Sequence, residues 1–189
     1  MTHFSVTLPP SWFEFDGWRA THTGELARLV DRRLEERPSL APLRGRIVRS
    51  LRDVAVQADR AGVVFAAAMV EPLTDRNLLL ASAFGAVQDV PEGVGDPDVE
   101  TIAAQITSTA GRHVAMAEIP AGRCVRVTAV QPSDEADRSV TMQTLVPVPG
   151  EQRVLNFVMS SPHVELADAL LDLFDAVSST VQWSPSAVS

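Results

Sequence analysis

The stretch that decides the fold is Val154-Leu155-Asn156-Phe157-Val158-Met159, which has the composition of a β-strand. It runs through Ser160-Ser161-Pro162 into an amphipathic helix, and the whole segment stops at Val181-Gln182-Trp183. Ser161 is the expected N-cap of that helix. The helix has a wide apolar face, made by Leu166, Ala169, Leu170, Leu173, Phe174 and Val177. A strand that leads into such a helix predicts a sheet covered by helices.

A second pair of helices is expected near the N-terminus. Apolar residues recur at helical spacing from Leu26 to Leu34 and again from Leu43 to Ala58, with Arg37-Pro38-Ser39 between the two stretches. Gly62 is the expected C-terminal cap of the second helix. The pattern predicts an αα-hairpin inserted at residues 23–61.

The remaining segments read mostly as strands joined by turns. The expected strands are 4–8, 63–70, 78–84, 113–119, 123–130, 140–146 and 154–159. Residues 63–70 and 78–84 are continuous apolar runs, as in strands covered on both faces. One further helix is expected, with Asp96-Pro97 as its start, an apolar stripe from Val99 to Ile106 and Gly111 at its end.

These segments predict an α+β fold with a mostly antiparallel sheet of six or seven strands, packed by helices. We expect a single domain over residues 1–183 and a flexible tail at 184–189.

Composition excludes several classes of function. All 16 basic residues are arginine, so the lysine of a phosphate-binding P-loop or of a Schiff-base enzyme is missing. The net charge of −8 disfavours nucleic acid as a partner. No signal peptide or membrane-spanning run is expected, and the single Cys124 cannot form an internal disulfide, so we expect a cytoplasmic protein.

The opening Phe4-Ser5-Val6-Thr7-Leu8-Pro9-Pro10-Ser11-Trp12, the turn Ile119-Pro120-Ala121-Gly122 and the closing strand, helix and Val181-Gln182-Trp183 resemble the PsbP-like fold. That fold is shared by the oxygen-evolving PsbP proteins, a nuclear Ran-release factor and the mycobacterial LpqN lipoproteins. The chain also resembles actinobacterial proteins with the same Trp-Phe-Glu-Phe-Asp opening. The resemblance implies a non-catalytic binding module, by analogy of fold. The helical hairpin and the lack of a lipobox cysteine depart from the pattern, so a cell-surface role is not carried over.

Charge is unevenly distributed, which suggests a binding surface. Residues 19–60 hold ten arginines against six acids, a balance of 10 − 6 = +4, which leaves 6 − 18 = −12 elsewhere. An acidic stripe on the last helix, Glu165, Asp168, Asp172 and Asp175, is either a solvated outer face or a contact surface. The candidate partner-binding residues are Arg33, Arg46, Arg49, Arg60, Trp12 and Trp18.

The aromatic cluster Trp12, Phe13, Phe15 and Trp18 has two interpretations, a partner groove or a plug in the core. Cys124 stands between Arg123 and Arg126, which favours a thiolate, but an isolated strand cysteine is ordinarily a packing residue. His3, His22, His113 and His163 have no metal-ligand spacing, so no metal or cofactor is expected.

Two functions remain open. The first is a non-enzymatic module that docks a protein partner, or a second copy of itself, through the hairpin and aromatic segment. The alternative is a small-molecule-binding protein or minor enzyme with a pocket between sheet and hairpin, where Gln143 and Asn156 would supply polar groups. A homodimer is expected because few helices are available to cover the sheet.

Overall fold

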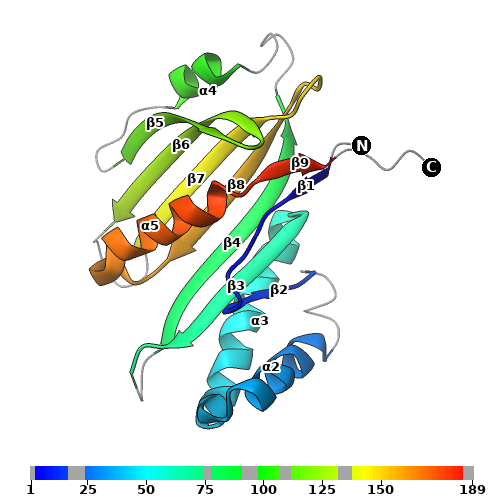
Figure 1. Cartoon of the computed structure of the whole chain (residues 1–189), viewed down its shortest axis with the longest axis vertical. Helices are drawn as coiled ribbons and strands as arrows, with labels where there is room; N and C mark the ends of the chain where they lie inside the picture. Colours follow the sequence, from blue (N-terminus) through cyan, green and yellow to red (C-terminus); the bar gives the residue numbers. More distant parts are fainter. Residues whose placement is uncertain are drawn as a thin grey trace, which may run out of the picture. The chain divides into compact units, whose positions relative to one another are not determined.

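The computed structural model describes residues 3–16, 24–74, 78–90, 98–106, 112–131 and 138–184. It confirms the α+β class, with a seven-stranded antiparallel sheet and a separate two-stranded sheet (Figure 1). The chain divides into two compact units. We call Pro10–Gly85 the hairpin unit, and Met1–Pro9 with Ala86–Ser189 the sheet unit.

The hairpin unit contains the predicted αα-hairpin and three strands. The helices are α2 (Glu25–Glu36) and α3 (Arg44–Ala61), joined by the 3-10 helix η1 (Pro38–Leu43). The strands are β2 (Trp12–Glu14), β3 (Phe65–Pro72) and β4 (Leu78–Asp89), paired antiparallel in that order, and β4 continues beyond Gly85. Both helices lie within the range 23–61 that the sequence predicted for the hairpin.

Small side chains let α3 pack closely on β3 in this unit. Ala55 and Ala58 of the helix and Ala66 and Ala68 of the strand share one buried cluster, and each is at most 2% exposed. Around them lie the larger apolar residues Phe13, Phe15, Leu26, Val30, Leu40, Ile47, Leu51, Val70 and Leu78. Residues 66–70 of β3 are all buried within the single chain. For β3, the shortage of covering elements that led us to expect a homodimer does not arise.

The sheet unit is built on a meander of four strands. β8 (Arg153–Ser161), β7 (Ser139–Pro147), β6 (Gly122–Gln131) and β5 (Arg112–Ile119) pair antiparallel in that spatial order. Val125 and Val127 of β6 pack with Val99 of α4 (Val99–Gln105). On the opposite face, Arg126 of β6 bonds to α5 (Ala167–Ser178). The predicted alternation of β6 is confirmed, since each face packs against a different helix.

Two short strands were not predicted as such. Trp12 and Phe13 lie in β2, paired with β3. The first strand is shorter than expected: β1 (His3–Ser5) pairs with β9 (Gln182–Ser184) in the two-stranded sheet. Ser184 therefore lies in a strand and not in the predicted tail, whose remaining residues, 185–189, fall outside the described part of the chain.

Helix starts differ from the sequence prediction. Ser161 is the last residue of β8, and a 3-10 turn, η2 (Val164–Leu166), precedes α5. Helix α4 is capped by Asp98, whose carboxylate accepts a hydrogen bond from the Thr101 N–H at 2.6 Å. That bond holds the pKa of Asp98 below its usual value. The predicted cap Asp96-Pro97 and the predicted stop Gly111 lie outside the described residues. Across the described helices, none has the length and apolar character needed to cross a bilayer.

Gly62 ends α3 in the left-handed conformation, as predicted, with φ of 60°. Gly62→Ala should destabilise the fold by about 1 kcal/mol, because a side chain disfavours that backbone region even where space is open. The matched control is Gly45→Ala, inside the same helix and also facing open space, which should stabilise by about 0.5 kcal/mol. Urea denaturation measures the free energy of unfolding of both variants. If both substitutions shifted that free energy in the same direction, the prediction would be contradicted.

Candidate interaction surface

The outer side of α3 carries a row of exposed arginines, Arg46, Arg49 and Arg60, which we call the arginine face. The helix turns Ile47, Leu51 and Ala55 inward, each at most 1% exposed. With 3.6 residues per turn, the positions of the arginine face then fall on the opposite side. The structure thus brings three predicted binding residues to one surface.

Two other arginines of the hairpin unit are held by acids within the unit. Arg44 at the start of α3 makes two hydrogen bonds to Asp31 of α2, at 2.6 and 2.9 Å. Arg37, between α2 and η1, donates hydrogen bonds to both carboxylate oxygens of Glu71 in β3, at 3.0 and 2.9 Å. The guanidinium of Arg44 lowers the pKa of Asp31. These pairs link α2 to α3 and the end of α2 to β3 within the unit.

Arg33 and Trp12, two of the predicted binding residues, are used inside the unit. The Arg33 guanidinium lies 5.1 Å from the centre of the Phe13 ring and donates a 3.4 Å hydrogen bond to the Trp12 carbonyl oxygen. Trp12 is 6% exposed. This arrangement matches the core-plug interpretation of the aromatic cluster, and neither residue belongs to the exposed surface. Trp18 lies outside the described residues.

Cys124 has the surroundings of a packing residue. It is fully buried in β6, and burial raises the pKa of its thiol, although the nearby Arg126 opposes that shift. Arg126 is instead bonded to Asp175 and, at 2.8 Å, to Ser179. Arg123 makes a 2.6 Å bond to Glu100 of α4. A thiol held neutral and covered is a poor nucleophile.

The acidic stripe of the last helix has partners in its own unit at both ends. Asp175 pairs with Arg126, and Glu165 pairs with Arg138 at 3.1 Å. Asp168 and Asp172 between them are exposed. This is the arrangement expected of a solvated outer face, the first of the two interpretations.

Histidines are dispersed. His163 lies 3.1 Å from Glu165, while His3 and His113 are exposed on different strands. His22 is not among the described residues. In the part of the chain that the structure describes, no three metal-ligating side chains come together.

Two hollows of the hairpin unit are defined by their lining residues, one small and one lined by charged side chains. One of about 150 Å³ lies at the end of α3, between Phe15, Asp59, Gly62 and Val64. Another, of about 490 Å³, is lined by charged side chains of α2, namely Glu25, Arg28, Asp31, Arg32 and Glu35. Ligand pockets are typically apolar and hold about 300–1,000 Å³, so neither fits a metabolite site. In the sheet unit, the Gln143 amide donates to Asn156 at 3.0 Å, which ties up these two polar groups.

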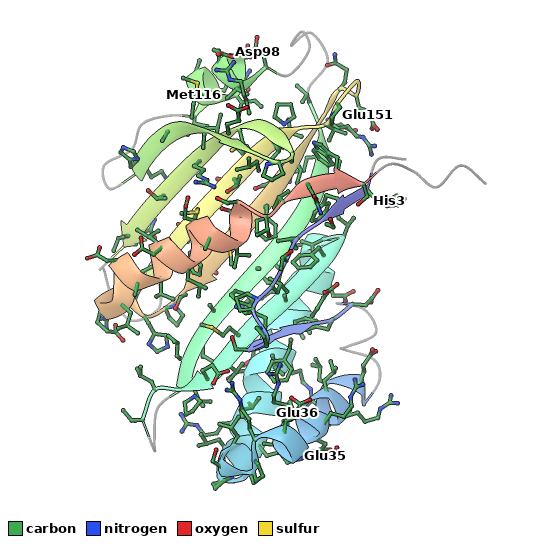
Figure 2. The ribbon with its side chains drawn as sticks, in the orientation of Figure 1. His3, Glu35, Glu36, Asp98, Met116 and Glu151 are labelled. Carbon is green, nitrogen blue, oxygen red and sulfur yellow. The ribbon has the colours of Figure 1, made fainter. Side chains whose placement is uncertain are left out.

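Among the described residues, sequence reasoning missed three exposed apolar residues: Val64, 68% exposed in the run expected to be covered on both faces, Leu73, and Met116, which is 57% exposed on β5 near α4 (Figure 2). The strand itself was predicted. A signal was available in the alternation of Arg112, Val114, Met116 and Glu118 on one face, which mixes charge with apolar side chains.

Comparison with known proteins supports the fold alone. Neither the known protein-family models nor the curated proteins contain a match. Among solved structures, the chain is similar to LpqN of Mycobacterium tuberculosis, a protein involved in cell envelope biogenesis. The TM-score is 0.53 at 9% identity, over 98% of this chain and 85% of LpqN. The fold is therefore distantly LpqN-like, in agreement with the resemblance found in the sequence.

Replacing Arg33 tests its inward role. Arg33→Ala should lower the free energy of unfolding by about 1 kcal/mol, because it removes the cation–π contact with Phe13 and the bond to Trp12. Its neighbour Arg32 is exposed, so Arg32→Ala should change that free energy by less than about 0.5 kcal/mol. Chemical denaturation of both measures the difference, and equal effects would show that Arg33 is a surface residue.

Thiol labelling tests the inert state of Cys124. In the native protein Cys124 should react at least about a hundredfold more slowly than in denaturant, because labelling requires the strand to open. Met116→Cys supplies an exposed thiol on the neighbouring strand that should be labelled at once. Rapid native labelling of Cys124 would revive the nucleophile interpretation.

Proposed function

We propose that this protein is a non-catalytic interaction module that docks an acidic surface of a partner protein on the arginine face. One observation carries the proposal. Arg49 and Arg60 are exposed on the outer side of α3 and form no ion pair with any other described residue, whereas Arg33, Arg37 and Arg44 all bond within the unit. A folded helix that keeps such charges available suits recognition better than stability.

The energetics favour a role in orientation and selectivity. Each exposed ion pair contributes roughly 0–1 kcal/mol, so three arginines alone do not make a tight complex. They do steer an oppositely charged surface into register and disfavour a basic one. The net charge of −8 disfavours long polyanions, so the proposed partner is a compact acidic protein surface and not nucleic acid or membrane.

The alternative, a small-molecule-binding protein or minor enzyme, has less support. Its proposed polar groups, Gln143 and Asn156, bond to each other. The hollow of about 150 Å³ at the end of α3 is below the usual size for a metabolite. We therefore place the interaction module first.

The proposal also includes the cellular compartment of the protein and the kind of organism that makes it. We place the protein in the cytoplasm of an actinobacterium, and a single buried cysteine without a disulfide partner agrees with a reducing compartment. The envelope role stays with LpqN, because 9% identity carries a fold and not a process.

Charge reversal tests the proposal. Arg49→Glu/Arg60→Glu should weaken recovery of a stably associated protein by about tenfold or more, because two attractive contacts become repulsive. Arg28→Glu/Arg32→Glu changes the net charge equally on α2 and should leave recovery unchanged. Quantitative affinity purification, followed by titration of the purified pair at increasing salt, measures both.

The folded state of each variant is checked by its thermal unfolding curve. Equal recovery with both double variants would refute the arginine face as the docking surface. Binding of a metabolite that raises the melting temperature, with no protein recovered, would favour the alternative.

A further inference from the structure

Strand β5 forms a free edge in the described part of the sheet. It stands last in the strand order and pairs with β6 on one side (Figure 1). Arg112, His113, Met116 and Glu118 are exposed along it. A strand at the end of a sheet presents unpaired N–H and C=O groups, which can bind another strand. With eight residues, β5 is long enough to do so.

Backbone geometry restricts how such a strand can pair with its own copy. In an antiparallel pair, two residues that lie opposite each other both turn their backbone groups toward the partner or both turn them away. Only alternate residues of β5 can point outward, because the others face β6. Two residues that lie opposite each other across the pair of copies must therefore differ in number by an even amount. One residue then lies opposite its own copy, at the centre of the pairing.

The register centred on Ala115 makes β5 complementary to itself. It sets Arg112 opposite Glu118 of a second copy, and by symmetry Glu118 opposite Arg112. It also sets Val114 opposite Met116, which would cover the exposed methionine. Centring on Val114 would instead place Arg112 opposite Met116, and centring on Met116 would place Val114 opposite Glu118. Only the register on Ala115 pairs the charges.

The two charged residues are available for this contact. Neither Arg112 nor Glu118 makes an ion pair with another described residue. Arg123, directly opposite Glu118 on β6, is bonded to Glu100 of α4 at 2.6 Å. The other face of β5 carries His113, Ala115 and Ala117, and in this register His113 lies opposite the small Ala117 of the second copy.

We propose that two copies of this protein pair antiparallel through β5, centred on Ala115, and so join their sheets across a two-fold axis. Opposite charges at Arg112 and Glu118 select the register, since a shifted strand would leave them unpaired. The proposal does not depend on the arginine face, which lies in the other unit. Contact along one strand is a small interface, so a weak, concentration-dependent dimer is expected.

Charge swapping tests the pairing. Sedimentation equilibrium from about 5 to 500 μM should show a reversible dimer, because an interface of this size is weak. Arg112→Glu or Glu118→Arg alone places like charges opposite each other twice, and should raise the dissociation constant roughly tenfold to a hundredfold. The double variant Arg112→Glu/Glu118→Arg restores opposite charges and should restore the dimer. Asp172→Arg, on the exposed side of α5, is the control and should change nothing.

Cysteine cross-linking reads the register directly. Ala115→Cys should form a disulfide-linked dimer on oxidation, because the two copies of residue 115 lie opposite each other about 5 Å apart. Ala117→Cys is the control on the same face: its two copies lie roughly 13 Å apart along the strand and should not link. Cys124→Ala is introduced in both variants, because Cys124 lies directly opposite Ala117 on β6 and could otherwise form an intrachain disulfide with a cysteine at 117. A chain monomeric throughout the concentration range, no rescue by the double variant, or equal linking at 117 would each overturn the proposal.

Discussion

The close packing of α3 on β3 is the contact on which the hairpin unit depends. Alanine on both sides, with Ala55 and Ala66 at 0% and 2% exposure, lets the helix backbone approach the strand. That approach fixes which side of α3 is inward. The opposite side then has to carry the charges, and the arginine face follows from the positions of the alanines as much as from those of the arginines.

Elements with a strong internal period were predictable from the sequence. A short window of residues is enough to predict each of them: the two helices of the hairpin, the left-handed Gly62 and the strands of the sheet unit. Strands β2 and β9 cannot be predicted in this way, because each has three residues and exists only through a partner far away in sequence. The start of α5 was misjudged because Ser161 extends the β8 pairing, opposite Val140, and a 3-10 turn follows before the helix.

The candidate surface was predictable to the same extent. Helical spacing placed Arg46, Arg49 and Arg60 on an exposed face, and the structure agrees. It could not reveal that Arg33 turns back over Phe13, or that Trp12 is buried, since both depend on where β2 lies. Charge alone does not distinguish an arginine that anchors a core from one that faces solvent.

The pairing of β1 with β9 has a consequence for synthesis on the ribosome. His3 lies opposite Ser184, Thr180 bonds to Thr7, and the Trp183 indole donates to the Ala121 carbonyl at 2.9 Å. β1 therefore gains its strand partner only after residues 182–184 have been synthesised, while the hairpin unit is one continuous segment, Pro10–Gly85. During translation the hairpin unit can therefore fold while β1 still lacks its partner β9.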